Sequence, residues 1–263
     1  MTDVPVNHAL PLLSGGRIPV LGLGTWQLTG ERAYDAVRAA LEIGYRHIDT
    51  ATMYGNEDVI GRALADSGVA RDEVFVTTKF PAELLGHERE ALEASLGKLR
   101  LEYVDLWLIH WPPGGRAAPQ TWQEFVAAQE RGQARNIGVS NYSLAQITEL
   151  VSATGVTPVV NQIPWSPRDY DAQLVAGHQE RGIVLEGYSA FKRSKLDAPA
   201  FQEIAAAHGV TTAQVILRWH IEHDIVAIPK SSSRDRLSTN FTVWDFALSP
   251  GEVAAIDAMG GAG

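Results

Sequence analysis

Short, nearly continuous apolar runs recur along the chain and alternate with longer stretches that have helical periodicity. Apolar runs of this kind are typical of parallel strands that are buried on both faces, because such strands have no polar side to alternate with. The runs predict eight strands, at 19–23, 46–49, 74–79, 104–110, 134–139, 159–162, 184–188 and 225–228.

Recognisable helix ends lie between the predicted strands. Gly44, Gly132 and Gly182 each follow a helical stretch, and the next strand begins a few residues later, as expected for left-handed glycine caps. Ser or Thr followed three positions later by Glu or Gln predicts a capping box at a helix start. Four such pairs are Thr121 with Glu124, Ser143 with Gln146, Thr211 with Gln214, and Ser249 with Glu252.

Repeated strand and helix units predict an α/β fold, a (β/α)8 TIM barrel formed by one domain over residues 1–263. Residues 12–18 include a Gly-Gly pair and predict an N-terminal β-hairpin that plugs one barrel end. The main alternative is a doubly wound Rossmann sheet. Its fingerprint fails here, because Gly22-Leu23-Gly24 lacks the third glycine and no helix follows at once.

Composition narrows the classes of partner. The net charge of -9 argues against a nucleic-acid surface, and hydrophobic residues at 45% provide for a sizeable core. The absence of cysteine excludes disulfides and thiolate chemistry. Without a leader or a membrane-length apolar run, we expect a cytoplasmic monomer that binds a small molecule and neither nucleic acid nor membrane.

Four residues at or just beyond predicted strand ends carry the candidate chemistry: Asp49, Tyr54, Lys79 and His110. In a barrel the carboxyl ends of the strands meet at one face. A buried Lys beside a Tyr stabilises phenolate, and an Asp keeps that Lys charged, so the set suits protonation of a carbonyl oxygen. The alternative without catalytic function is a buried Asp-Lys pair, with the Tyr and the His as unrelated neighbours. No second ligand accompanies His110 at metal-binding spacing, so we expect no metal site.

The loop at 230–236 concentrates cations and hydroxyl groups in an otherwise acidic chain. A barrel commonly places a phosphate site at its last loops, and Arg binds phosphate through two parallel hydrogen bonds. The alternative interpretation is a solvated, serine-rich loop with a helix cap at Ser233.

Over nearly its whole length the sequence resembles the aldo-keto reductase superfamily, and its short C-terminal end resembles the bacterial 2,5-diketo-D-gluconate reductase-like branch. The motifs that carry the resemblance are Leu21-Gly22-Leu23-Gly24-Thr25-Trp26, Gly44-Tyr45-Arg46-His47-Ile48-Asp49-Thr50-Ala51, Tyr54-Gly55-Asn56-Glu57, the segment 104–112, Ile137-Gly138-Val139-Ser140-Asn141-Tyr142, Asn161-Gln162 and Ile228-Pro229-Lys230-Ser231.

The resemblance implies an NADP-dependent oxidoreductase that reduces aldehydes and ketones reversibly. Asp49, Tyr54, Lys79 and His110 match the family's catalytic tetrad, in which the Tyr gives a proton to the substrate oxygen. Lys79 is expected to lower the pKa of Tyr54 towards the working range. The residues implied for substrate are Trp26, Tyr54, His110 and Trp111.

The family binds NADP(H) in an extended pose without a Rossmann motif. The residues that the resemblance assigns to the cofactor are Thr25, Trp26, Asp49, Ser140, Asn141, Gln162, Tyr188, Ser189, Phe191, Lys230, Ser231, Ser232, Ser233, Arg236 and Asn240. Among them, Lys230 and Arg236 would contact the 2'-phosphate.

Two other functions stay open on the sequence alone. One is a non-catalytic NADP-binding sensor or regulatory subunit, which the intact tetrad disfavours. The other is a barrel aldolase that forms a Schiff base on Lys79.

Overall fold

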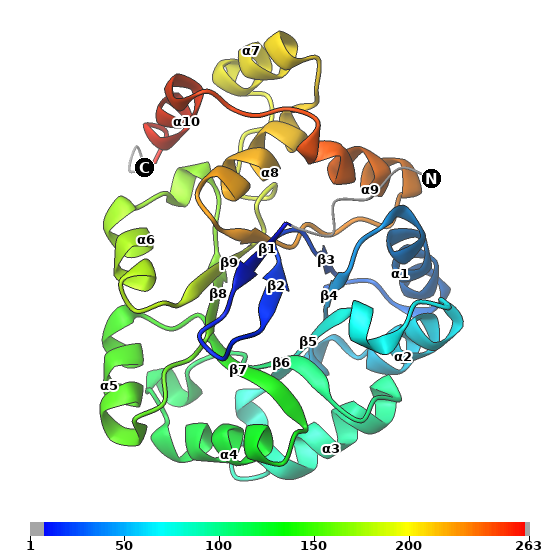
Figure 1. Cartoon of the computed structure of the whole chain (residues 1–263), viewed down its shortest axis with the longest axis vertical. Helices are drawn as coiled ribbons and strands as arrows, with labels where there is room; N and C mark the ends of the chain where they lie inside the picture. The colour runs from blue at the N-terminus through cyan, green and yellow to red at the C-terminus, as the bar shows by residue number, and fades with distance from the viewer. Residues whose placement is uncertain (1–7, 261–263) are drawn as a thin grey trace.

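The computed structural model describes residues 8–260 and contains a closed barrel of eight parallel strands (Figure 1). The strands are neighbours in chain order, and the bridge between Leu21 and Ala227 joins the two ends of the sheet. Gly22 N donates to the oxygen of Ala227 at 2.9 Å, which adds to the closure. The predicted (β/α)8 fold is therefore confirmed. The barrel strands are β3 (Leu23–Gly24), β4 (His47–Asp49), β5 (Phe75–Phe80), β6 (Val104–Ile109), β7 (Ala134–Ser140), β8 (Val160–Pro164), β9 (Val184–Tyr188) and β10 (Val226–Ala227).

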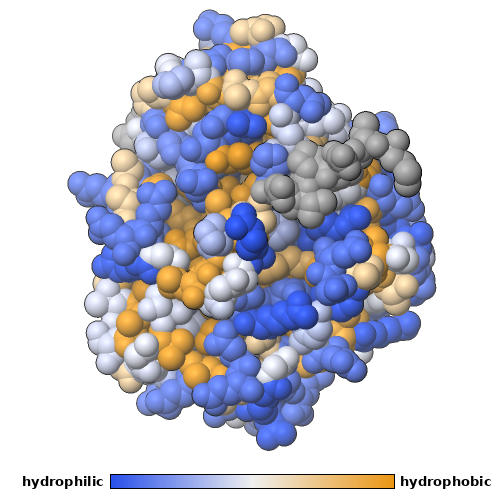
Figure 2. Space-filling model, viewed as in Figure 1, coloured by the Kyte–Doolittle hydropathy of each residue, from blue (hydrophilic) through white to orange (hydrophobic). Residues whose placement is uncertain are grey.

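A two-stranded hairpin lies across one end of the barrel (Figure 1). It consists of β1 (Ala9–Pro11) and β2 (Arg17–Pro19), paired antiparallel. Leu12 and Ile18 are buried against barrel residues that include Leu106. On the face that the hairpin occupies, hydrophilic side chains are interspersed with hydrophobic ones (Figure 2). The hairpin thus covers the apolar barrel interior, as predicted.

The first predicted strand, 19–23, is wrong at its start. Pro19 ends β2, where it pairs with Ala9 across the hairpin. A proline lacks the N–H that an interior strand needs, so it fits at the edge of a sheet.

Helices surround the barrel, while α7 and α10 lie beyond α8 at its periphery (Figure 1).

Side-chain caps set three helix starts where predicted, at Ser143, Thr211 and Ser249. The predicted start at Thr121 is wrong, because the helix begins at Pro119 and Thr121 is buried, donating a hydrogen bond to Glu88. The helices are α1 (Gly30–Ile43), α2 (Glu57–Asp66), α3 (Glu88–Leu99), α4 (Pro119–Glu130), α5 (Leu144–Thr154), α6 (Ala172–Gln179), α7 (Pro199–His208), α8 (Thr212–Glu222), α9 (Arg234–Phe241) and α10 (Pro250–Asp257).

Gly22 and Gly24, which resemble part of a nucleotide-binding fingerprint, instead allow neighbouring barrel segments to approach closely. A Cβ atom at Gly24 would lie 2.6 Å from the main-chain oxygen of Ile228, and one at Gly22 would lie 2.8 Å from the His47 ring. A larger residue at Gly24 would push β3 away from the segment that follows β10, and one at Gly22 would collide with His47 on β4. Across residues 8–260, no helix has the length and apolarity needed to cross a membrane.

Candidate active site

The four predicted residues meet at the carboxyl end of the barrel. Asp49 ends β4, Lys79 lies near the end of β5, and His110 directly follows β6. Tyr54 ends η1 (Thr52–Tyr54), a short 3-10 turn after β4. The carboxyl ends of parallel barrel strands meet at one face, which is why residues far apart in sequence share one site.

Lys79 is fully buried and its ammonium group has several acceptors. Nζ lies 2.7 and 2.6 Å from the two Asp49 carboxylate oxygens and 2.9 Å from the main-chain oxygen of Thr50. Burial alone lowers the pKa of Lys79, but the charge of Asp49 and its neighbours outweighs burial and the net pKa is raised. Lys79 therefore remains a cation in the barrel interior.

The Tyr54 hydroxyl lies 3.4 Å from Lys79 Nζ, at the inner end of the pocket. Burial raises the pKa of Tyr54 above its usual value, and the opposing effect of Lys79 does not cancel that rise. The expectation that Lys79 lowers the pKa of Tyr54 towards the working range is therefore wrong. Burial destabilises the phenolate by more than the Lys79 ammonium stabilises it. Tyr54 is consequently a protonated phenol at neutral pH.

His110 forms the neighbouring wall, with its ring centroid 5.7 Å from that of Tyr54. Burial, together with the charge of Lys79, lowers the pKa of His110 to about 3. The imidazole is therefore neutral at physiological pH. Its Nδ1 is buried without a hydrogen-bond partner among residues 8–260.

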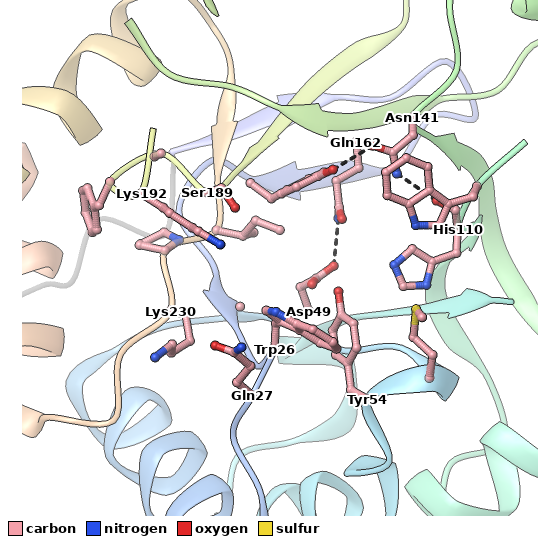
Figure 3. A pocket seen from close by; sticks show the side chains of 18 residues that line it. Trp26, Gln27, Asp49, Tyr54, His110, Asn141, Gln162, Ser189, Lys192 and Lys230 are labelled. Carbon is pink, nitrogen blue, oxygen red and sulfur yellow. Dashed lines mark hydrogen bonds between the residues drawn. The ribbon is translucent and has the colours of Figure 1, made fainter. Parts of the chain in front are cut away.

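A pocket of about 570 Å³ opens above these residues (Figure 3). At its mouth, the side chains of Trp26 and Trp111 are each 50% exposed. Figure 3 shows Lys192 and Lys230 at the end opposite His110. The pocket thus has one aromatic end and one cationic end. Lining residues predicted from the sequence are Trp26, Asp49, Tyr54, His110, Trp111, Asn141, Gln162, Tyr188, Ser189, Phe191 and Lys230.

Polar groups at the ends of β7, β8 and β9 form a connected wall. Asn141 donates from Nδ2 to the oxygen of His110 at 2.9 Å and accepts from the Tyr188 hydroxyl at 2.8 Å. Ser140 is buried and donates to the main-chain oxygen of Gln162 at 2.8 Å. Asn141 has a left-handed backbone with φ of 65°, and such strained residues often occur at functional sites. Through Asn141 this wall contacts His110 of the tetrad.

Several residues assigned to the cofactor lie outside the pocket lining. Thr25 is buried, and its hydroxyl donates to the main-chain oxygen of Asp49 at 2.9 Å. Ser140, at the end of β7, is also outside the lining. The others belong to the loop after β10 and to α9. Ser233 caps α9, Ser232 accepts hydrogen bonds from Arg32 on α1, and Arg236 is exposed. Ser231 and Asn240 are buried.

Further pocket residues escaped prediction. Gln27, Met53 and Lys192 line it and come from the loops after β3, β4 and β9. Loop residues carry no periodic signal, so only their closeness to predicted residues could have indicated them. Glu186, fully buried in β9, also escaped, although a carboxylate within an apolar run is a usable signal.

A parallel barrel with an acid, a phenol, an ammonium and a neutral imidazole at its carboxyl end defines a barrel enzyme class. The sequence matches the model of the Aldo/keto reductase family over residues 20–260, and the chain belongs to this family. The resemblance stated from the sequence is confirmed, including its bacterial 2,5-diketo-D-gluconate reductase-like branch.

Similar proteins include reductases. Methylglyoxal reductase DkgA of Salmonella typhimurium is 41% identical over 253 residues, which cover 94% of this chain and 92% of that protein. An aldo-keto reductase of Mycolicibacterium vanbaalenii is 43% identical, covering 98% and 94%. The Bombyx mori aldo-keto reductase, solved in complex with NADP, has a TM-score of 0.87 and 35% identity, covering 96% and 92%. Membership of this family supports carbonyl reduction as the chemistry of this chain.

The Asp49 and Lys79 pair yields a stability prediction. Asp49→Asn leaves the buried ammonium without its counter-charge, so the free energy of unfolding should fall by about 3–5 kcal/mol. The double variant Asp49→Asn with Lys79→Met should lose much less than the sum of the two single losses. Urea denaturation of the wild type, Asp49→Asn, Lys79→Met and the double variant measures this coupling. If the two single losses simply add, Asp49 and Lys79 do not stabilise the protein as a pair.

Proposed function

We propose that this protein is an NADPH-dependent reductase of aldehydes and ketones, with Tyr54 as the proton donor. The observation that carries the proposal is the Tyr54 hydroxyl 3.4 Å from the Lys79 ammonium, inside a pocket with a neutral His110 beside it. A phenol, unlike a carboxylate, is still protonated at neutral pH and is able to give a proton to an oxygen that gains charge.

Lys79 contributes most after the proton leaves. The ammonium interacts weakly with a neutral phenol and strongly with phenolate, so it stabilises the charge that develops as the proton moves. Asp49 holds the ammonium in place through both carboxylate oxygens. His110, as a neutral imidazole, would donate a hydrogen bond to the substrate carbonyl and set its position.

The pocket fits a nicotinamide cofactor, which would supply the hydride for reduction. Tyr188 offers a flat face in the wall, and Asn141 and Gln162 offer amide groups beside it. The cationic end at Lys192 and Lys230 suits phosphate groups. We assign the 2'-phosphate of NADPH to Lys230 and Arg236, the adenine to Asn240, and the remaining loop contacts to the hydroxyl groups of residues 231–233.

The substrate end of the pocket is aromatic. Trp26, Met53 and Trp111 surround the approach to Tyr54 and are each about half exposed, at 50%, 49% and 50%. An open mouth of this kind suits small carbonyl compounds of varied shape. Because relatives are named methylglyoxal reductases, methylglyoxal belongs in the first panel of substrates.

A Schiff-base aldolase is disfavoured by the state of Lys79. Imine formation needs a neutral amine, which enzymes obtain by lowering the lysine pKa. Here the pKa of Lys79 is raised, and the amine is fully buried against Asp49. A purely regulatory nucleotide binder would not need the tetrad that is assembled at this pocket.

Tyr54→Phe tests the proton donor. Removing the hydroxyl should lower kcat for carbonyl reduction by at least about 100-fold, because general acid catalysis is lost. NADPH affinity should be almost unchanged, since the wall around Tyr188 stays intact. NADPH oxidation and tryptophan fluorescence measure the two quantities, and wild-type turnover in the variant would overturn the mechanism.

Arg236→Ala tests cofactor choice. The Kd for NADPH should rise by about tenfold or more, because a charged contact to the 2'-phosphate is lost. The Kd for NADH, which has no such phosphate, should change little. Arg234→Ala is the matched control: Arg234 lies on the same helix turn but pairs with Glu42 at 2.7 Å. Equal losses for NADPH and NADH in Arg236→Ala would contradict the assignment.

A further inference from the structure

Glu186 is a fully buried carboxyl group that the catalytic scheme does not use. It lies in the middle of β9, with its side chain inside the barrel beside the tetrad. Glutamate is almost never fully buried unless it has a partner. One of its oxygens, Oε1, has no hydrogen bond to any residue within 8–260.

Its main partner is the amide of Gln162. The two residues lie directly opposite each other in the β8 and β9 register. Gln162 Nε2 donates to Glu186 Oε2 at 3.1 Å and to Asp49 Oδ2 at 2.8 Å. An amide nitrogen has two hydrogens, so both are used. The amide oxygen of Gln162 is then the group left for the pocket, which Gln162 lines.

Several ionisable groups face Glu186. They are His47 and Asp49 on β4, Lys79 on β5 and Tyr54 on η1. From β10, its register partner is the apolar Val226. His47 Nε2 lies 3.6 Å from Glu186 Oε1.

Both members of the His47 and Glu186 contact are neutral at pH 7. Burial, reinforced by the charge of Asp49, raises the pKa of Glu186 to about 8, and burial lowers the pKa of His47 to about 3. His47 Nδ1 lies 3.4 Å from the oxygen of Pro19, which only accepts, so Nδ1 carries the ring proton. Nε2 is therefore an acceptor. It lies 3.1 Å from the Thr77 hydroxyl and faces the protonated carboxyl group at 3.6 Å.

We propose that Glu186 is a positioning residue: its carboxyl oxygen accepts the second amide hydrogen of Gln162 and fixes the Gln162 oxygen toward the nicotinamide carboxamide. This role rests on the proposed NADPH-dependent function. A protonated Glu186 suits this positioning role better than an ionised one. An ionised Glu186 would add a second negative charge beside Asp49 and would compete with it for the Lys79 ammonium.

Two variants at Glu186 separate this role from simple packing. Glu186→Gln keeps an oxygen that accepts from Gln162 and is an isostere of the protonated acid, so the Kd for NADPH at pH 7 should match the wild type. Glu186→Met fills a similar volume without an acceptor. One buried Gln162 hydrogen then has no partner, and the Kd should rise by about tenfold.

Glu88→Met is the control for loss of a buried carboxyl group. Glu88 is 6% exposed and accepts a hydrogen bond from Thr121 at 2.9 Å, outside the residues that line the active-site pocket. This variant should lose stability without any change in NADPH affinity. Quenching of tryptophan fluorescence by NADPH gives each Kd without relying on turnover.

Thermal unfolding provides a second readout that a packing role would not move. The pKa of Glu186 is about 8 in the folded protein, above its value in the unfolded chain, so the folded protein binds the proton more tightly. The wild type therefore loses stability as the pH rises from the pKa of the unfolded chain through that of the folded protein. Glu186→Gln has no such group. Its Tm relative to wild type should therefore be higher at pH 8 than at pH 5.

Each outcome has a clear meaning. Wild-type NADPH affinity in Glu186→Met, or equally weak binding in both variants, would overturn the role of Glu186. A Tm difference independent of pH would overturn its protonated state. A wild-type protein that binds NADPH but reduces no carbonyl would contradict the proposed function alone, because the Kd comparison still tests Glu186.

Discussion

One buried ion pair, Lys79 with Asp49, sets the conditions for the rest of the site. An unpaired ammonium in the barrel interior would cost several kcal/mol, so the pair must form as β4 and β5 come together. It forms because Asp49 ends β4 beside Thr77 on β5, two residues before Lys79. Barrel closure, which requires Gly24 to lie against Ile228, then brings the remaining strand ends to the same pocket. Fold and chemistry therefore depend on the same strand registers.

Four ionisable groups around this pair are neutral: His47, His110, Tyr54 and Glu186. Burial lowers the pKa values of His47 and His110 to about 3 and raises those of Tyr54 and Glu186. The ion pair of Lys79 and Asp49 thus balances one cation with one carboxylate, and Tyr54, the proposed proton donor, keeps its proton. A site with this balance stabilises phenolate when it forms and does not create it in advance, which suits an enzyme that donates a proton only to a carbonyl in place.

Much of this arrangement could be predicted from the sequence, because it depends on local patterns of apolar and polar residues. Apolar runs indicate the strands, and polar residues at the carboxyl ends of parallel strands share one face, so the sequence alone predicts that Asp49, Lys79 and His110 lie together. The role of Glu186 could not be predicted in this way, because it depends on which residue faces Gln162 across the sheet. The net pKa shift of Tyr54 also depends on the extent of burial, which is a tertiary property. The contact between Arg32 and Ser232 joins α1 to the loop after β10 and has no local signal.

The central claim is that the pocket above Tyr54 carries direct reduction of a carbonyl group. Incubation with NADPH deuterated at C4 on one face and a small carbonyl substrate, followed by mass spectrometry of the alcohol, tests it most directly. The account predicts one deuterium on the carbinol carbon from a single face of the cofactor, with the hydroxyl proton exchangeable with water. An alcohol without deuterium from either face, or no alcohol at all, would contradict it.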